Sequence, residues 1–171
     1  IEVSEIETGE IMLDKEVIDC NKILRSVHGK KIEEAKKKGL NFYLVFEKGG
    51  LSINADWVKL EKVIQSLVDN AIKYTRAGEV VLLSRVIGKK AEIVISDSGD
   101  GINKTQLKKI LEPFTQEEEV GYSRNYEGAG LGLTLAYKLT KLMGGEFHIQ
   151  SEKRIGTKVT ITFPIVKSSD N

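Results

Sequence analysis

The sequence has 171 residues, 40% of them hydrophobic and 30% charged, a composition typical of one folded domain. The formal net charge of +1 gives no reason to invoke nucleic acid or a membrane surface as a partner. Cys20 is the only cysteine, which excludes an intrachain disulfide, and no apolar run approaches the ~20 residues needed to cross a bilayer. We expect a cytoplasmic domain. The chain begins without a methionine, so a longer and membrane-anchored parent protein stays open.

The first part of the chain predicts a helix between two strands. Residues 1–9 are interpreted as the last turns of a helix from a preceding domain, and residues 10–18 as a short strand. Asp19 can cap a helix over 20–38, and 41–46 is a β-rich run that ends in a glycine turn. The apolar residues of this helix keep a spacing that places them on one face: Cys20, Ile23, Leu24, Val27 and Ala35.

A central helix is predicted over 57–75, with Asp56 as its N-cap. Two strands follow, over 79–87 and 91–96, and a turn at 88–90 joins them as a hairpin. The apolar face of the central helix consists of Leu60, Val63, Ile64, Leu67, Val68 and Ala71.

The last part of the chain contains two helices, a long loop and a hairpin. The predicted segments are, in order, a helix capped by Asn103 that ends near Leu111, a loop over 113–128, a helix over 130–143, two strands over 146–151 and 157–165, and a tail over 167–171. The second of these helices is expected to turn four leucines inward, namely Leu131, Leu135, Leu139 and Leu142. A long loop inside a compact domain is usually a lid or a binding loop.

Together these segments predict an α+β domain over residues 10–166, a two-layer sandwich. Its mixed sheet of about five strands would be covered on one face by three helices. The turns at 88–90 and 153–156 are too short for the crossovers of a doubly wound parallel sheet, which disfavours that alternative.

Three side chains of the central helix, Asn70, Lys73 and Tyr74, fall on one face because they lie three and four residues apart. A neutral amide oxygen can ligate magnesium without adding charge beside a polyphosphate, and a lysine can hold a phosphate as a point charge. Taken alone, each residue is more often a plain solvated helix position, so the trio depends on the motifs that follow.

The first glycine-rich stretch, DSGDGI at 97–102, follows a predicted strand. The Asp97 carboxylate can accept a hydrogen bond from an exocyclic amine such as that of adenine. Gly99 and Gly101 let the backbone approach a flat base closely. A plain turn explains this stretch equally well when it is taken in isolation.

The second glycine-rich stretch, GAGLGL at 128–133, opens a helix directly after the long loop. Free backbone N–H groups and the helix dipole favour a phosphate at such a helix N-terminus. A dinucleotide-binding fingerprint would need a preceding strand, and here a loop precedes it, so we reject that interpretation.

In their order, these motifs resemble the catalytic ATP-binding domain of sensor histidine kinases, which has the Bergerat fold of the GHKL superfamily. That superfamily also includes type II topoisomerases, mismatch-repair ATPases and heat-shock chaperones. The resemblance covers roughly residues 14–165, and the head, 1–9, resembles the end of the dimerisation and phosphoacceptor domain of such kinases. The matching motifs are DNAIKYT (69–75) for the asparagine box, DSGDGI (97–102) and GAGLGL (128–133) for the glycine boxes, EPF (112–114) for the phenylalanine box and the late pair Gly156-Thr157.

The resemblance implies that the chain binds ATP and Mg²⁺. Asn70 would coordinate the magnesium, Lys73 would touch the phosphates, and Arg124 in the lid over 115–127 would reach the γ-phosphate. The remaining residues that it assigns to the nucleotide are Tyr74, Asp97, Gly99, Gly101, Ile102, Phe114, Gly128, Gly130, Leu131, Gly132, Leu133 and Thr157.

Ser66 stands one helical turn before Asn70, where the ATPase branches of the superfamily carry a glutamate that activates water. Serine is a poor base at neutral pH, and neither Glu61 nor Asp69 replaces that glutamate by its position on the helix. We therefore expect a kinase that presents the γ-phosphate to a histidine. A GHKL-type ATPase or conformational switch and a non-catalytic nucleotide-binding module are the alternatives.

Neither histidine of the chain is expected to be the phosphoacceptor, because His28 lies inside a predicted helix without an acidic neighbour and His148 lies in a predicted strand. The resemblance then implies two partners, a histidine-bearing dimerisation domain of the same parent protein and, downstream, the receiver domain of a response regulator. The fragment would be monomeric and its parent homodimeric.

Overall fold

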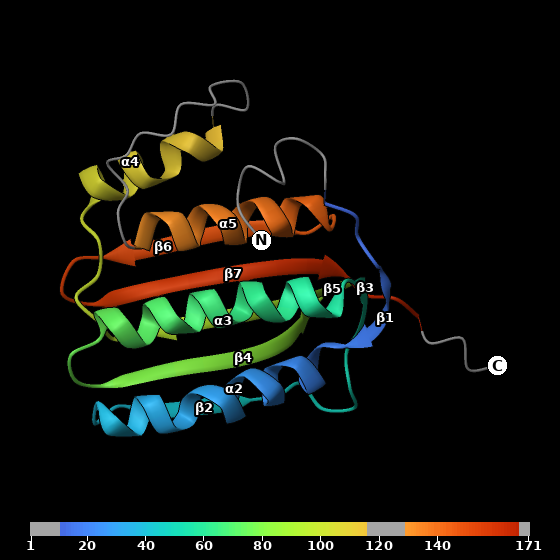
Figure 1. Ribbon diagram of the computed structural model, residues 1–171, viewed down its shortest axis with the longest axis horizontal. Coiled ribbons are helices and arrows are strands. Elements are labelled where there is room, and N and C mark those ends of the chain that lie inside the picture. Colours follow the sequence, from blue (N-terminus) through green and yellow to red (C-terminus); the bar gives the residue numbers. More distant parts are fainter. Residues whose placement is uncertain (1–10, 116–128, 168–171) are drawn as a thin grey trace.

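The computed structural model describes residues 11–115 and 129–167, in which helices pack on one face of a mixed β-sheet (Figure 1). The helix end expected over 1–9 and the tail beyond residue 167 lie outside the described residues. The elements are, in order, β1 (Glu16–Asp19), α2 (Cys20–Lys37), β2 (Asn41–Val45), β3 (Ser52–Ala55), α3 (Trp57–Tyr74), β4 (Glu79–Ile87), β5 (Lys90–Asp97), α4 (Lys104–Thr115), α5 (Ala129–Leu142), β6 (Glu146–Glu152) and β7 (Gly156–Pro164).

The main sheet has five strands in the order β2-β4-β5-β7-β6. β2 and β4 are parallel, whereas the other neighbours are antiparallel and include the predicted hairpins β4–β5 and β6–β7. Figure 1 shows α2, α3 and α5 side by side over one face of this sheet, with α4 beyond α5. The predicted α+β sandwich, with about five strands and three covering helices, is therefore confirmed.

α3 forms as expected because its cap and its apolar spacing agree. The Asp56 carboxylate accepts a hydrogen bond from the Lys59 backbone N–H at 3.1 Å, which satisfies one of the free donors at the helix N-terminus. Burial of each aliphatic side chain contributes about 1.5–3 kcal/mol, so the inner face anchors the whole helix against the sheet. Its buried residues are Leu60, Val63, Ile64, Leu67, Val68, Ala71 and Ile72.

α2 also begins and ends where the sequence predicts. The Asp19 side chain accepts from the Asn21 backbone N–H at 3.0 Å, and Gly39 takes the positive φ of 79° that ends the helix. All five predicted inner residues of this helix are buried, from Cys20 to Ala35. Burial raises the pKa of the Cys20 thiol to about 12, with the Asp19 charge adding to the rise, so this thiol stays protonated.

A small second sheet, in which β1 pairs antiparallel with β3, was not predicted. The strand expected over 10–18 begins only at Glu16, and β3 was missed altogether. Each strand has four residues, which is too short for an alternation of apolar and polar side chains to be recognised.

The two helices around the expected loop also differ from the prediction. α4 continues to Thr115, four residues beyond the predicted end at Leu111, so the loop does not begin at Pro113. Pro113 lacks the N–H that would bond to the carbonyl four residues earlier, and the helix nevertheless continues for two residues beyond it.

In α5 the inward stripe is only partly the predicted one. Leu139 is buried, but Leu142 is 39% exposed, and the side chain of Leu131 lies outside the described residues. Both the predicted and the observed stripes have helical spacing, so periodicity alone could not choose between them. The buried residues of α5 and its end are Leu133, Ala136, Leu139, Thr140 and Met143. Among the described residues, none of the helices is both long and apolar enough for a membrane span.

Candidate functional site

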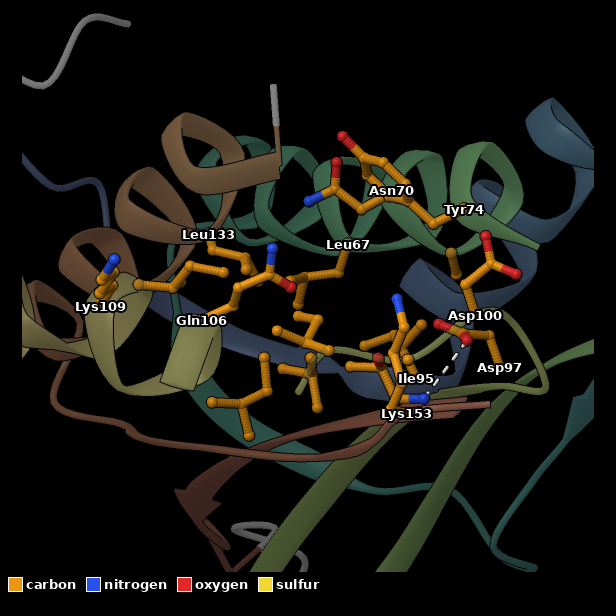
Figure 2. Close-up of a pocket in the computed structure, with 17 residues that line it drawn as sticks. Leu67, Asn70, Tyr74, Ile95, Asp97, Asp100, Gln106, Lys109, Leu133 and Lys153 are labelled. Atoms are coloured by element: carbon orange, nitrogen blue, oxygen red, sulfur yellow. Dashed lines mark hydrogen bonds between the residues drawn. The ribbon is translucent and has the colours of Figure 1, made fainter. Parts of the chain in front are cut away.

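A cavity of about 510 Å³ lies between α3, α4, α5 and the helix-facing side of the sheet (Figure 2). Its floor is apolar because strands β5, β6 and β7 and the two helices α3 and α5 all turn aliphatic side chains into it. Such a slot, with polar groups only at its margins, suits a flat ring with polar substituents. The apolar lining includes Leu67, Ile95, Ile102, Leu133, Ile149 and Val159.

The polar side chains gather at the two ends and along the rim of the cavity. Figure 2 shows Asp97, Asp100 and Lys153 at one end and Gln106 and Lys109 at the other. These five residues come from four segments, namely the end of β5, the loop after it, the β6–β7 turn and α4. The cavity therefore has a carboxylate-rich end and a second end with an amide and an amine.

α3 brings Asn70 and Tyr74 to the rim of the cavity, as the shared helix face predicts. Lys73 is not one of the described residues that line it. The Lys73 ammonium lies 5.3 Å from the centroid of the Tyr74 ring, and the side chain borders a neighbouring groove with Lys37 and Lys38. The structure thus brings two of the three predicted side chains of this face to the cavity.

Asn70 faces the first turns of α5. A Cβ atom added to Gly132 would stand 3.2 Å from Asn70 Nδ2, so the helices approach closely at this point. The Nδ2 atom is buried and has no hydrogen-bond partner among the described residues. Leu133, the next residue of α5, lines the cavity and is buried. A buried polar group that the described residues leave without a partner, at the rim of a cavity, is suited to a ligand.

Asp97 is held at the carboxyl end of β5, directly opposite Thr157 of β7. Its Oδ1 accepts hydrogen bonds from the backbone N–H groups of Gly99 at 2.9 Å and Thr157 at 3.3 Å. Burial raises the pKa of the Asp97 carboxyl above its ordinary value, and these two hydrogen bonds oppose only part of the rise. The carboxylate is fixed in orientation by one oxygen, which leaves Oδ2 for a ligand.

The glycines of the first glycine-rich stretch allow a close approach between segments. Gly101 has φ 68°, and a Cβ atom there would collide with the carbonyl oxygen of Glu152. A Cβ atom on Gly99 would stand 2.6 Å from the Tyr74 carbonyl oxygen. The loop is also bonded to both neighbours, because Asp100 N donates to Tyr74 O and Asp100 O accepts from Arg154 N. The end of α3, this loop and the β6–β7 turn therefore form one tightly packed unit.

Several predicted residues cannot be placed. Arg124 and Gly128 lie outside the described residues, and so do the side chains of Phe114 and Leu131 and the surroundings of Gly130. The lid expected over 115–127 falls almost wholly outside the described residues too, because only Thr115 is described, as the last residue of α4.

The candidate bases and nucleophiles on the helices do not reach the cavity. Ser66 is half-buried and is not among the described residues of the cavity lining. Asp69 pairs with Lys31 at 2.7 Å. The His28 ring contacts the Phe42 carbonyl oxygen at 3.0 Å and packs on the Phe42 ring.

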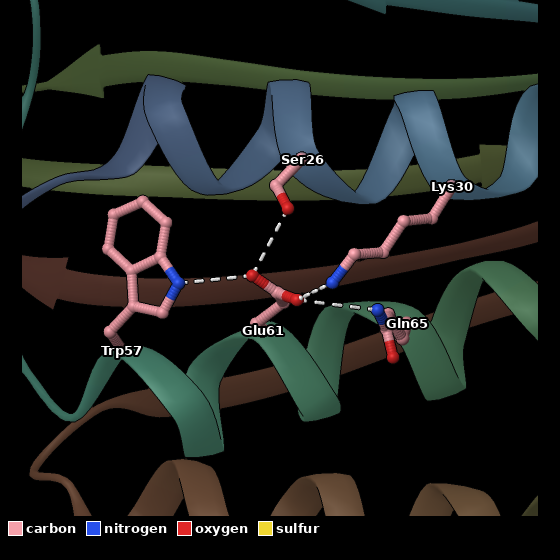
Figure 3. Close-up of polar contacts among 5 residues, drawn as sticks. All are labelled: Ser26, Lys30, Trp57, Glu61 and Gln65. Atoms are coloured by element: carbon pink, nitrogen blue, oxygen red, sulfur yellow. Dashed lines mark hydrogen bonds and ion pairs between the residues drawn. The ribbon is translucent and has the colours of Figure 1, made fainter.

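Glu61 has a structural role between α2 and α3 (Figure 3). Its carboxylate accepts from Ser26 Oγ at 3.2 Å and Trp57 Nε1 at 3.0 Å, and it also contacts Lys30 and Gln65. Burial alone would raise the pKa of Glu61, but the hydrogen bonds and charge of Lys30 and the donors of Trp57 and Ser26 outweigh it and lower the pKa. An ionised and fully bonded carboxylate at this helix interface does not act as a base in the cavity.

Sequence reasoning missed part of the cavity lining. Ile149 and Val159 occupy alternate positions of β6 and β7 that face the helices, so strand alternation could have found them. Gln106, Lys109 and Lys153 carry no comparable signal, because only the packing of α4 and of the β6–β7 turn brings them to the cavity.

A family model described as "Histidine kinase-, DNA gyrase B-, and HSP90-like ATPase" matches residues 55–167, which is most of the described chain. The chain belongs to this family. The matched residues begin just before α3 and include every described element of the cavity. The family that the motifs resembled is therefore confirmed.

Proteins similar in sequence carry the names of sensor histidine kinases. The chain is 30% identical over 166 residues to the sensor histidine kinase RcsC of Salmonella typhimurium. The alignment includes 96% of this chain and 17% of that protein. It is 32% identical over 174 residues to the autoinducer 2 sensor kinase/phosphatase LuxQ of Vibrio parahaemolyticus. The alignment includes 96% of this chain and 20% of LuxQ. The chain thus spans about a fifth of the length of these two relatives.

Solved structures of histidine kinases share the fold of this ATPase-family domain. A structure of full-length ShkA in complex with AMPPNP superimposes with a TM-score of 0.80 at 25% identity, over 96% of this chain and 34% of ShkA. The catalytic domain of the histidine kinase ThkA superimposes with a TM-score of 0.73 at 24% identity, over 88% of this chain and 97% of that domain. The likeness to ThkA extends over nearly the whole of its catalytic domain.

Proposed function

We propose that this ATPase-family domain binds Mg-ATP in the cavity and donates the γ-phosphoryl group to a histidine on a separate dimerisation domain. The observation that carries the proposal is the half-free Asp97 carboxylate at the end of an apolar slot. That combination suits adenine, which has a flat apolar ring and an exocyclic amine. The ShkA structure, a histidine kinase with a bound ATP analogue, supports the same ligand.

In this proposal the base lies between Ile102, Ile149 and Leu133 with its amine toward Asp97. The triphosphate leaves along α3 past Tyr74 and Asn70 to the start of α5, where backbone N–H groups favour phosphate. Lys73 would turn from its place over the Tyr74 ring to the phosphates. Arg124, Gly128 and Gly130 belong to the proposal on the sequence motif alone, whereas Gly132 is placed beside Asn70.

Magnesium fits this arrangement as a companion of the triphosphate. Asn70 offers one neutral amide oxygen as a ligand, while its buried Nδ2, which lacks a partner in the described part of the chain, is a hydrogen-bond donor suited to a phosphate oxygen. The residues that the structure describes hold no group of three or more His, Cys, Asp or Glu side chains suited to a metal ion. Magnesium commonly takes one or two protein oxygens and completes its shell with phosphate and water. When bound, it would neutralise charge that develops on the phosphates.

Transfer to a histidine is favoured over hydrolysis because Ser66 stands where the ATPases carry a glutamate that activates water. No other described residue on this part of α3 supplies such a base to the cavity. Glu61 and Asp69 are both engaged at the interface of α2 and α3. His28 is packed against Phe42, which leaves it no access to the cavity. We therefore assign the nucleophile to a dimerisation domain of the parent protein, with residues 1–9 as the end of its helix and a receiver domain as the next acceptor. The parent would act as a homodimer, with this domain in the cytoplasm.

Incubation with γ-labelled ATP and magnesium tests this proposal. The isolated chain is expected to release phosphate at background rate and to retain no stable label, because its described residues place neither a general base nor an acceptor histidine at the cavity. Mixed with the histidine-bearing domain of its parent, it is expected to transfer acid-labile label, and Asn70→Ala should abolish that transfer. Phosphate release well above background that Asn70→Ala removes would show a hydrolase instead.

A further inference from the structure

Ser151 connects the loop after β5 to the β6–β7 hairpin, although it does not line the cavity. Its hydroxyl oxygen lies 2.8 Å from the Ile102 backbone nitrogen, 3.1 Å from the Gly156 carbonyl oxygen and 2.7 Å from Thr157 Oγ1. Thr157, by contrast, does line the cavity, at the end that carries Asp97. Ser151 therefore reaches a ligand through the residues that it bonds, which are Ile102, whose side chain belongs to the apolar lining, and Thr157, whose hydroxyl can hydrogen-bond a ligand.

The three contacts of Ser151 are satisfied by a single distribution of protons. The Ile102 N–H can only donate and the Gly156 carbonyl can only accept, so the one Ser151 proton goes to Gly156. The Thr157 hydroxyl must then donate its own proton to Ser151 Oγ. A hydroxyl whose proton is engaged has only lone pairs left, so Thr157 presents an acceptor to the cavity.

Asp97 presents a second hydrogen-bond acceptor beside the Thr157 hydroxyl. The ionised carboxylate can only accept, and its Oδ1 already accepts from Gly99 and Thr157. Lys153, also at this end, is exposed to solvent, so its hydrated ammonium does not provide a fixed donor inside the slot. Two fixed acceptors thus stand side by side on β5 and β7.

We infer that Ser151 is a positioning residue for base specificity, which holds the Thr157 hydroxyl as an acceptor so that the site selects a 6-amino purine over a 6-oxo purine. The inference rests on the proposed function, because it takes the ligand to be a purine nucleotide in this cavity. An amino group brings two N–H donors to the pair of acceptors, directly or through one water molecule. A 6-oxo group brings lone pairs and leaves buried acceptors unpaired, which is the strongest basis for rejecting an analogue.

The test compares the dissociation constants of ATP and inosine triphosphate, with magnesium, for the 171-residue chain and its variants. Ser151→Ala frees the Thr157 hydroxyl to rotate and donate to a 6-oxo group, so the preference for ATP should fall by about five- to tenfold. Thr157→Val removes the acceptor and should also lower the preference. Ser151→Thr keeps a hydroxyl at this position and should therefore retain the preference for ATP.

Thr160→Val is the matched control, because Thr160 lies on the same strand as Thr157 and alternation turns its side chain to the opposite face of the sheet. It is expected to leave the ratio of the two dissociation constants unchanged. Equal weakening of both nucleotides in Ser151→Ala and Thr157→Val would reveal a purely structural role and overturn the inference alone. Failure of the unmodified chain to bind either nucleotide would overturn the proposed function and the inference with it.

Discussion

The Asp97 carboxylate is the group that we propose recognises the base, and its burial lowers the stability of the nucleotide-free chain. Burial raises the pKa of Asp97, which means that the folded chain holds the proton more tightly than the unfolded chain. The stabilising effect of that protonation is complete below the unfolded pKa and is lost as the pH rises through the folded pKa. Near neutral pH the ionised group therefore opposes folding.

Asp97→Asn is accordingly expected to raise the melting temperature of the nucleotide-free chain at pH 7, because it removes a partly buried charge while an amide oxygen still accepts from Gly99 and Thr157. The gain should shrink as the pH falls toward the raised pKa of Asp97. Thermal unfolding followed by circular dichroism at several pH values measures this. A lower melting temperature of the variant at pH 7 would contradict the direction of the shift.

At the scale of elements, the site depends on how closely three segments approach one another. The loop after β5 is bonded to the end of α3 through Asp100 N and Tyr74 O and to the β6–β7 turn through Asp100 O and Arg154 N. Gly101 stands between them with a positive φ and no room for a side chain. The position of Asp97 at the end of the cavity follows from this packing.

Gly101→Ala is expected to destabilise the chain far more than Gly88→Ala. The two glycines have similar φ values, 68° and 61°, so the conformational strain of an alanine is alike at both sites. At Gly88 an added Cβ atom meets open space, whereas at Gly101 it collides with the Glu152 carbonyl. We expect a cost of about 1 kcal/mol at Gly88 and about 3 kcal/mol or more at Gly101, measured by urea unfolding. Equal losses of stability in the two variants would mean that the loop can shift away from the β6–β7 turn, and would contradict the tight packing described above.

The sequence predicts some elements better than others, because only some of them are determined by a local pattern of residues. α2 and α3 follow from Asp19 and Asp56 as caps together with an apolar stripe. β4 to β7 follow from alternation and short turns. β1, β3 and the inward face of α5 depend on contacts with distant segments, which no local pattern records.

At the scale of the whole molecule, the site joins four parts of the chain: the second half of α3, β5 with the loop after it, the helix pair α4 and α5, and the hairpin β6–β7. Motifs predicted Asn70, Asp97 and Thr157 because ligand chemistry restricts the residue types there. Apart from Ile102 and Leu133, which belong to the glycine-rich motifs, the apolar lining and the polar residues of α4 could not be predicted in the same way. Any aliphatic side chain can serve in the lining, and the fold alone decides which ones meet.

Calorimetric titration of the 171-residue chain with ATP and magnesium tests the central claim most directly. The account predicts saturable binding of one nucleotide per chain, weakened by about 1–3 kcal/mol in Asp97→Asn through loss of the charge-assisted hydrogen bond. Glu92→Gln, on the same strand but outside the described lining of the cavity, is the matched control and should bind as the unmodified chain does. Absence of binding, or an affinity for ATP that Asp97→Asn leaves unchanged, would contradict the claim that this cavity is an adenine nucleotide site.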